Sequence, residues 1–123
     1  MSEKAKVLAL FEDYEPIIRS LGNILTGEGY QIAVCERDMN ESMKVAAQLN
    51  NLGVIAALVD GNLTTGETGN REGALITAKI HKKSPGVVVI GTASDGSVKG
   101  ADYNVEKTEG PQALLDVLAK IFR

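Results

Sequence analysis

Short continuous apolar runs recur along the chain, and charged residues or glycines bound each of them. The three strongest are Val7–Phe11, Ile55–Val59 and Val87–Ile90. Runs of this length suit strands of a parallel sheet that is covered on both faces. Two weaker, more alternating runs, 30–34 and 103–105, suit strands at the edges of a sheet. The pattern therefore predicts five strands.

Stretches with apolar residues at helical spacing lie between these runs. Pro16 and Pro111 stand where a first-turn proline is tolerated, and the cations of 79–83 favour a helix C-terminus. The predicted helical stripes are Ile17, Leu21, Ile24 and Leu25; Met39, Met43, Ala46, Ala47 and Leu49; Ala74, Leu75, Ala78 and Ile80; and Leu114, Leu115, Leu118, Ile121 and Phe122. This alternation predicts an α/β fold, a doubly wound parallel sheet with helices on both faces.

The segment that should hold the fourth crossover helix breaks the pattern. Residues 91–100 contain three glycines and almost no apolar periodicity. They leave room for one turn of helix at most. We therefore predict that the fourth crossover helix is missing or vestigial.

Length and composition narrow the class of protein. The 123 residues suit a single domain spanning 1–123, and the apolar run 54–59 is far too short to cross a membrane. A net charge of −3 argues against a surface that binds nucleic acid. The lone Cys35 excludes an internal disulfide and is interpreted as a small buried hydrophobe. With no signal-peptide pattern at its start, the chain is predicted to be a cytoplasmic domain.

Polar residues follow four of the predicted strands. Glu12 and Asp13 follow the first strand, Asp60 the third, Thr92 the fourth and Lys107 the fifth. In an open α/β sheet, ligands bind in the crevice outside the carboxyl ends of the strands. We therefore expect three carboxylates, one hydroxyl and one amine to meet in one crevice.

This set of groups favours phosphoryl chemistry. Crowded carboxylates repel one another, and a divalent cation relieves the repulsion. Oxygen ligands without histidine or cysteine suit Mg²⁺. A lysine and a hydroxyl supply a charge and a hydrogen bond for a phosphoryl group. The parts suffice for phosphoryl transfer to a carboxylate.

The sequence resembles the response-regulator receiver domains of two-component signalling, from about Lys6 to Phe122. The matching segments, in family order, are Val7–Asp13, Leu21 with Leu25 and Gly29–Tyr30, Leu58–Leu63, Val89–Ala93 and Gly100–Lys107. The resemblance implies a flavodoxin-like sheet with strand order 2-1-3-4-5.

The resemblance also implies roles. Asp60 would be the phosphoacceptor, taking its phosphoryl group from a phosphohistidine on a histidine kinase or histidine phosphotransfer protein. Thr92 and Lys107 would bind the phosphoryl oxygens. The receiver would catalyse only its own phosphorylation and dephosphorylation.

A magnesium ion would be held by Glu12, Asp13, Asp60 and the backbone carbonyl of Asn62. The resemblance further implies a downstream protein target or output domain, which the sequence does not identify. It implies no direct contact with nucleic acid or membrane.

The sequence also departs from the family pattern. Asn104 stands where the family has an aromatic residue, and Thr108 stands where it has a proline. The loop after Asp60 is a polar stretch, 64–70, without the usual proline. The segment from Thr92 to Lys107 is shorter than in a typical receiver by roughly two helical turns. The usual signalling face on the fourth helix is therefore excluded.

Several other interpretations remain open. A degenerate receiver-like module could bind proteins without being phosphorylated. A dehalogenase-type phosphatase would need a second acid two residues after Asp60, where Asn62 stands. A flavodoxin would need hydroxyls and amides where the acidic pair lies. Taken singly, Asp60 could cap a helix, Thr92 could serve a turn and Lys107 could be solvated.

Overall fold

The computed structural model describes residues 5–123, which contain a five-stranded parallel sheet in the order β2-β1-β3-β4-β5. The strands are β1 (Val7–Phe11), β2 (Gln31–Glu36), β3 (Ala56–Val59), β4 (Val88–Gly91) and β5 (Tyr103–Asn104). The predicted fold class and strand order are confirmed. The two weaker runs of the sequence form the two edge strands, β2 and β5.

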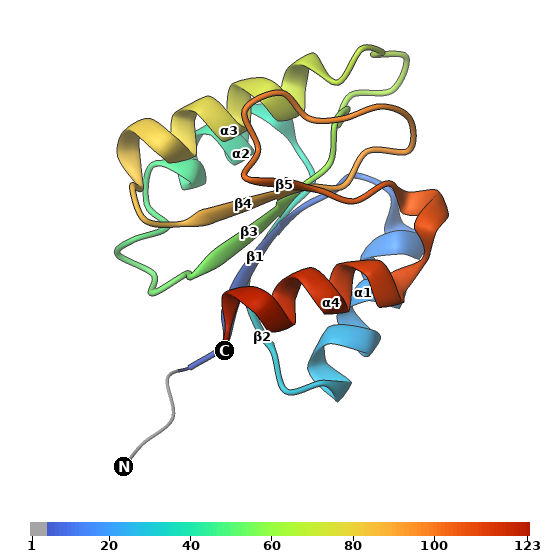
Figure 1. Cartoon of the computed structure of the whole chain (residues 1–123). Helices are drawn as coiled ribbons and strands as arrows, with labels where there is room; N and C mark the ends of the chain where they lie inside the picture. The colour runs from blue at the N-terminus through green and yellow to red at the C-terminus, as the bar shows by residue number, and fades with distance from the viewer. Residues whose placement is uncertain (1–4) are drawn as a thin grey trace.

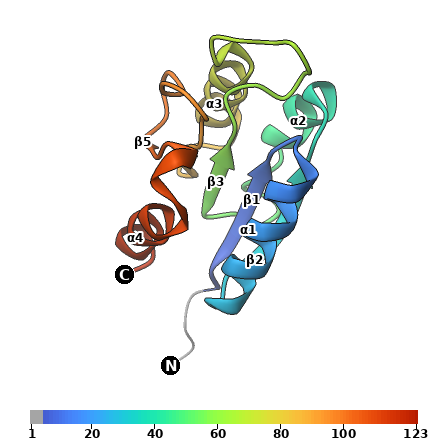
Figure 2. The ribbon, with the colours of Figure 1, turned by 90° about the vertical axis from the view of Figure 1, so that its right-hand side faces the viewer.

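Helices cover both faces of the sheet, as predicted (Figures 1 and 2). The helices are α1 (Glu15–Gly27), α2 (Met39–Ala46), α3 (Arg71–Lys83), the short 3₁₀-helix η1 (Lys107–Glu109) and α4 (Pro111–Ile121). α1 and α4 lie on one face, while α2 and α3 lie on the other. Among residues 5–123, no helix combines the length and the apolar character needed to cross a membrane.

The central strands divide their side chains between two hydrophobic cores. In β1, Ala9 and Phe11 face α2 and α3, whereas Leu8 and Leu10 face α1 and α4. Successive side chains of a strand point to opposite faces, so a strand covered twice must be apolar throughout. Full burial of each leucine contributes on the order of 2 kcal/mol. The two cores hold the carboxyl edge of the sheet in place.

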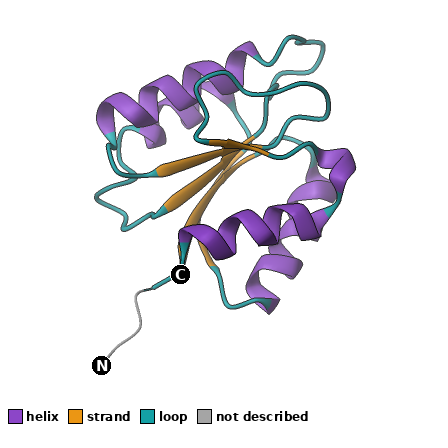
Figure 3. Cartoon of the chain, viewed as in Figure 1, coloured by secondary structure: helices purple, strands orange, loops and turns teal. Residues whose placement is uncertain are grey.

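The segment between β4 and β5 forms a loop, drawn in teal in Figure 3. Residues 92–102, all described by the structure, form no helix, so the predicted loss of the fourth crossover helix is confirmed. Val98 is buried, and its backbone N–H donates to Asn104 Oδ1 at 2.8 Å. Gly91 leaves room for both side chains, because a Cβ there would overlap Asn104 and Val98. The loop takes the helix's place on the sheet.

Two local predictions were wrong. Cys35 is exposed rather than buried, because β2 is an edge strand with incompletely covered faces. α2 ends at Ala46 and does not extend to Leu49, which follows in a turn. Leu49 is nevertheless fully buried.

Candidate functional site

The ends of β1 and β3 place two carboxylates side by side. The backbone N–H of Glu12 donates to Glu36 O at 3.0 Å, and that of Asp60 donates to Phe11 O at 2.9 Å. The ladder of sheet hydrogen bonds therefore continues one residue past each strand. This continuation fixes Glu12 and Asp60 at the carboxyl edge, as the sequence predicts.

Three carboxylates meet at this edge. Glu12, Asp13 and Asp60 each offer an oxygen, and these oxygens lie within 4.8 Å of one another. Glu12 is only 1% exposed and Asp60 only 6%. The cluster opens into a cleft of about 700 Å³, called here the acidic cleft. Its lining residues are Glu12, Asp13, Tyr14, Ile17, Asp60, Asn62, Thr68, Gly69, Asn70, Ser94, Asp95, Gly96 and Lys107.

Lys107 joins two of the carboxylates. Its Nζ lies 2.7 Å from Glu12 Oε1 and 3.0 Å from Asp60 Oδ1. The lysine begins η1, where Glu106 and Glu109 cap each other's backbone N–H groups. Its own backbone N–H donates to Ala93 O at 3.0 Å. The cap and this bond position the ammonium group over the cluster.

The ionisation of the cluster follows from burial and from its neighbours. Burial raises the pKa of Glu12 to about 7, and the charge of Asp60 adds to the rise while Lys107 opposes it. Burial alone would lower the pKa of Lys107, but its bonds to Glu12 and Asp60 raise it overall. Lys107 therefore stays charged, and one ammonium faces three carboxylates.

The donor set fits a hard divalent cation. All three candidate ligands are carboxylate oxygens, and Asn62 on the same cleft adds amide oxygens. Such ligands suit Mg²⁺, which keeps several waters and takes one or two carboxylates. The excess of negative charge in the cluster points to the same conclusion.

Thr92 lies next to this cluster but not in the acidic cleft. It follows β4, is 6% exposed, and donates its backbone N–H to Val59 O at 2.9 Å. Together with Val105, it lines a second cavity of about 170 Å³ between α1 and α4. The structure thus brings Glu12, Asp13, Asp60, Asn62 and Lys107 to one cleft and places Thr92 on its apolar neighbour.

Sequence reasoning missed the residues that organise the loop after Asp60. The Glu72 carboxylate accepts from Leu63 N and Thr64 N, both at 2.7 Å, and from Thr64 Oγ1 at 2.6 Å. Burial opposes ionisation of Glu72, but the bonds from Thr64 and Leu63 lower its pKa overall. Asn70 adopts φ 58°, which asparagine tolerates better than most residues. An asparagine in a glycine-rich loop was the available signal.

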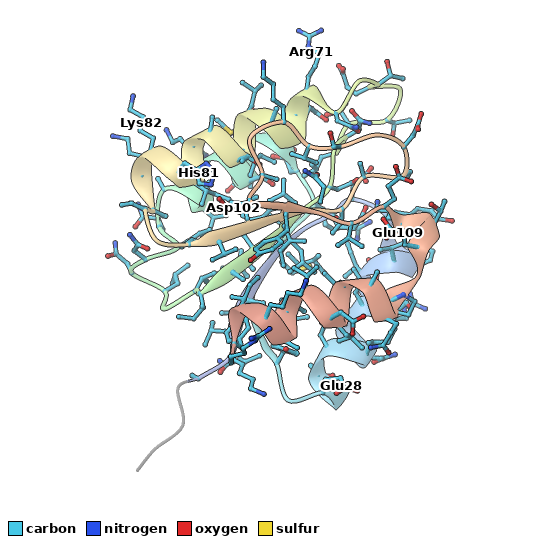
Figure 4. The ribbon with its side chains drawn as sticks, in the orientation of Figure 1. Glu28, Arg71, His81, Lys82, Asp102 and Glu109 are labelled. Atoms are coloured by element: carbon cyan, nitrogen blue, oxygen red, sulfur yellow. The ribbon has the colours of Figure 1, made fainter. Side chains whose placement is uncertain are left out.

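His81 lies outside the acidic cleft, as expected. Figure 4 shows it on α3, close to Asp102. His81 Nε2 and Asp102 Oδ2 are 3.2 Å apart, and both side chains are partly exposed. α3 crosses from one strand to a parallel neighbour, so its C-terminal end lies at the opposite edge of the sheet from the cleft.

Comparison with solved structures supports the receiver interpretation. A CheY-like response-regulator receiver domain from Methanospirillum hungatei JF-1 shares 25% identity, with a TM-score of 0.76 over 94% of this chain and 92% of that chain. A chain in the complex of histidine kinase ThkA with response regulator protein TrrA shares 20% identity, with a TM-score of 0.75 over 96% of this chain and 99% of that chain. No protein-family model and no curated protein matches the chain.

A third similar structure carries ligands. It is a response regulator from Burkholderia pseudomallei with a phosphorylated aspartic acid, a calcium ion and citrate. It shares 21% identity and a TM-score of 0.71, over 92% of this chain and 66% of that chain. The resemblance to receiver domains and the receiver fold, both predicted from the sequence, are confirmed.

Proposed function

We propose that this chain is a phosphoacceptor receiver of a two-component or phosphorelay system, acting in the cytoplasm. It takes a phosphoryl group from a phosphohistidine on a histidine kinase or histidine phosphotransfer protein and places it on Asp60. One observation carries the proposal: three carboxylates and one lysine, from three separate segments of the chain, meet at the mouth of one open cleft.

The two oxygens of Asp60 differ in their surroundings. The described residues direct both of their hydrogen bonds to Oδ1, from Gly61 N at 2.8 Å and from Lys107 Nζ at 3.0 Å. Oδ2 is therefore the oxygen available for attack on phosphorus. As the new O–P bond forms, the P–N bond breaks and the histidine nitrogen keeps its electron pair. Hydrolysis of the acyl phosphate later returns the carboxylate.

The surrounding residues neutralise the charge of this step. Lys107 faces the phosphoryl oxygens as a point charge, held in place by η1. Bound Mg²⁺, held by Glu12, Asp13, Asp60 and the backbone carbonyl of Asn62, would supply further positive charge. Thr92, which follows β4 and lines the neighbouring α1–α4 cavity, would bond a phosphoryl oxygen.

Intact-mass measurement after incubation with acetyl phosphate and Mg²⁺ tests the proposal. We expect wild type to gain one phosphoryl group and Asp60→Asn to gain none. Asp95→Asn is the matched control, because Asp95 lines the same cleft but lies outside the carboxylate cluster. It should label like wild type. Labelling that persists in Asp60→Asn would refute the assignment of Asp60.

A second candidate function is a receiver-like protein-interaction module that is not phosphorylated. Two observations favour it: Thr92 lines the apolar cavity and not the acidic cleft, and Asn104, at the family's aromatic position, bonds Val98 through its side chain. This candidate predicts no phosphoryl adduct under conditions that label an ordinary receiver. It also predicts an amide-exchange pattern unchanged by beryllofluoride with Mg²⁺.

A further inference from the structure

Two asparagine side chains line the acidic cleft and connect two of its loops. Asn62 Nδ2 donates to Asn70 Oδ1 at 3.1 Å, and Asn70 N donates back to Asn62 Oδ1 at 3.0 Å. Asn70 Nδ2 then donates to the carbonyls of Asp95 at 2.8 Å and Ser97 at 3.2 Å. These two asparagines, called here the asparagine strap, connect the segment after Asp60 to the loop between β4 and β5.

Asn70 also packs against the backbone that follows Asp60. A Cβ on Gly61 would overlap the amide oxygen of Asn70, so only glycine admits this side chain. Both Asn62 and Asn70 line the acidic cleft, as do Ser94 and Gly96 of the loop. A shift of the backbone at 60–62 would therefore displace the Asn70 side chain.

The loop has a second, independent attachment. Asn104 Oδ1 accepts from Val98 N at 2.8 Å, and Asn104 Nδ2 donates to Val98 O at 3.4 Å. Asn104 thus holds the same loop as Asn70, one residue further along. Asn70, in contrast, also holds Asn62. The two asparagines therefore separate an effect on the loop from an effect on the cleft.

We propose that Asn70 is a positioning residue that couples occupancy of the acidic cleft to the conformation of residues 94–97. It fixes Asn62, which lines the same cleft as the three carboxylates, and with the same side chain it holds the loop that replaces the fourth crossover helix. This inference rests on the proposed function, because it assumes that Mg²⁺ enters the cleft. Coupling of this kind is reciprocal: Mg²⁺ binding and the Asn70 contacts with Asp95 and Ser97 stabilise each other.

Calorimetric Mg²⁺ titration and amide hydrogen exchange of residues 93–101 test the proposal on the full chain. Asn70→Gly removes the side chain and keeps the left-handed backbone accessible. We expect Mg²⁺ affinity to fall roughly tenfold, as for other partners that orient metal ligands. Asn104→Ala is the control, and its affinity should stay within about twofold of wild type. Exchange of the loop should speed up in both variants.

A second variant tests the strap even if Asn70→Gly fails to fold. Asn62→Ala cuts the strap at its other member, so it should weaken Mg²⁺ binding by a similar factor. Both changes break the same contact between Asn62 and Asn70. The double variant should therefore bind Mg²⁺ no more weakly than the single variant of lower affinity. Fully additive losses would contradict the strap.

The other outcomes distinguish a failure of the coupling from a failure of the proposed function. Unchanged Mg²⁺ affinity in Asn70→Gly overturns the coupling while leaving the proposed function intact. Equal weakening in Asn104→Ala also overturns it, because the effect would then arise from the loop and not from Asn62. Loop exchange that is insensitive to Mg²⁺ in wild type does the same. Wild type that binds no Mg²⁺ overturns the proposed function, and the coupling with it.

Discussion

Glu12 carries the largest electrostatic cost among the residues of the site. It is almost fully buried, beside the Asp60 carboxylate, and Lys107 is its nearby cation. A buried carboxylate loses hydration that one shared ammonium group only partly replaces. Without a metal ion, the charged form of Glu12 is therefore disfavoured, and its protonation should affect the stability of the whole fold.

Stability should depend on pH through Glu12. Its pKa is about 7 in the folded chain against an ordinary 4.5, so the folded state binds the proton more tightly. The resulting stabilisation is complete below pH 4.5, declines as the pH rises, and is lost above pH 7. We expect the free energy of unfolding of wild type, measured with urea in EDTA, to fall by on the order of 3 kcal/mol relative to that of Glu12→Gln across this pH range. Parallel pH profiles for the two proteins would contradict the prediction.

Strand ends explain which site residues could be predicted from the sequence. Glu12 and Asp60 directly follow apolar runs, and Lys107 ends a family segment, so parallel strands carry all three to one edge. The cavity that Thr92 lines depends on how α1 and α4 pack, which local spacing does not encode. The contact of Asn62 with Asn70 depends on a left-handed backbone eight residues later.

At the scale of elements, α3 packs unusually close to the backbone of Asp60 and Gly61. Gly73 lies in the first turn of α3, and its backbone N–H donates to Gly61 O at 2.8 Å. A Cβ on Gly73 would overlap the carbonyl oxygen of Asp60 and the Cα of Gly61. These are backbone atoms, which cannot rotate out of the way. Gly73 therefore sets the distance between α3 and Asp60.

Gly73→Ala should destabilise the protein although alanine is the better helix former. The gain in helix propensity is about 1 kcal/mol, whereas overpacking against fixed backbone costs about 1–3 kcal/mol. We expect a lower urea midpoint for Gly73→Ala and slower labelling by acetyl phosphate. Gly22→Ala, in α1 with open space around the new Cβ, is the control. It should raise stability by about 0.5–1 kcal/mol; a stabilised Gly73→Ala would refute the close packing.

The elements differ in how far the sequence predicts them. β1, β3 and β4 lie in the interior of the sheet, so their composition alone marks them as buried strands. β5 consists of two residues, Tyr103 and Asn104, so the alternation of 103–105 marks this edge strand only weakly. The missing crossover helix was predictable because 91–100 lacks an apolar stripe. What takes its place was not, because the loop is held by Asn70 and Asn104 from elsewhere in the chain.

At the scale of the molecule, the acidic cleft gathers negative charge in a chain that is already acidic. The net charge is −3, and three carboxylates share one end of the sheet. A cation that binds the folded cluster and not the unfolded chain shifts the folding equilibrium by mass action. Metal binding is therefore measurable as a change in global stability, without any phosphoryl donor.

Mg²⁺ should raise the melting temperature at pH 8, where Glu12 is ionised. At free Mg²⁺ of about 100 times Kd the gain is roughly 2.7 kcal/mol, or about 10 °C for a domain of this size. Asp13→Asn should lose most of the shift. Asp116→Asn, which removes the same charge from an exposed site on α4, should keep it. The measurement is a calorimetric melt in MgCl₂ against NaCl of equal ionic strength.

The pattern of melting shifts also decides between the two candidate functions. A phosphorylated receiver needs a specific metal site, so wild type and Asp116→Asn should shift together while Asp13→Asn does not. A general response of an acidic protein to divalent ions would shift all three proteins alike, since each keeps a negative net charge. That result, or no shift in any of them, would favour the unphosphorylated interaction module. The three melting experiments therefore test metal binding by the three carboxylates separately from phosphorylation of Asp60.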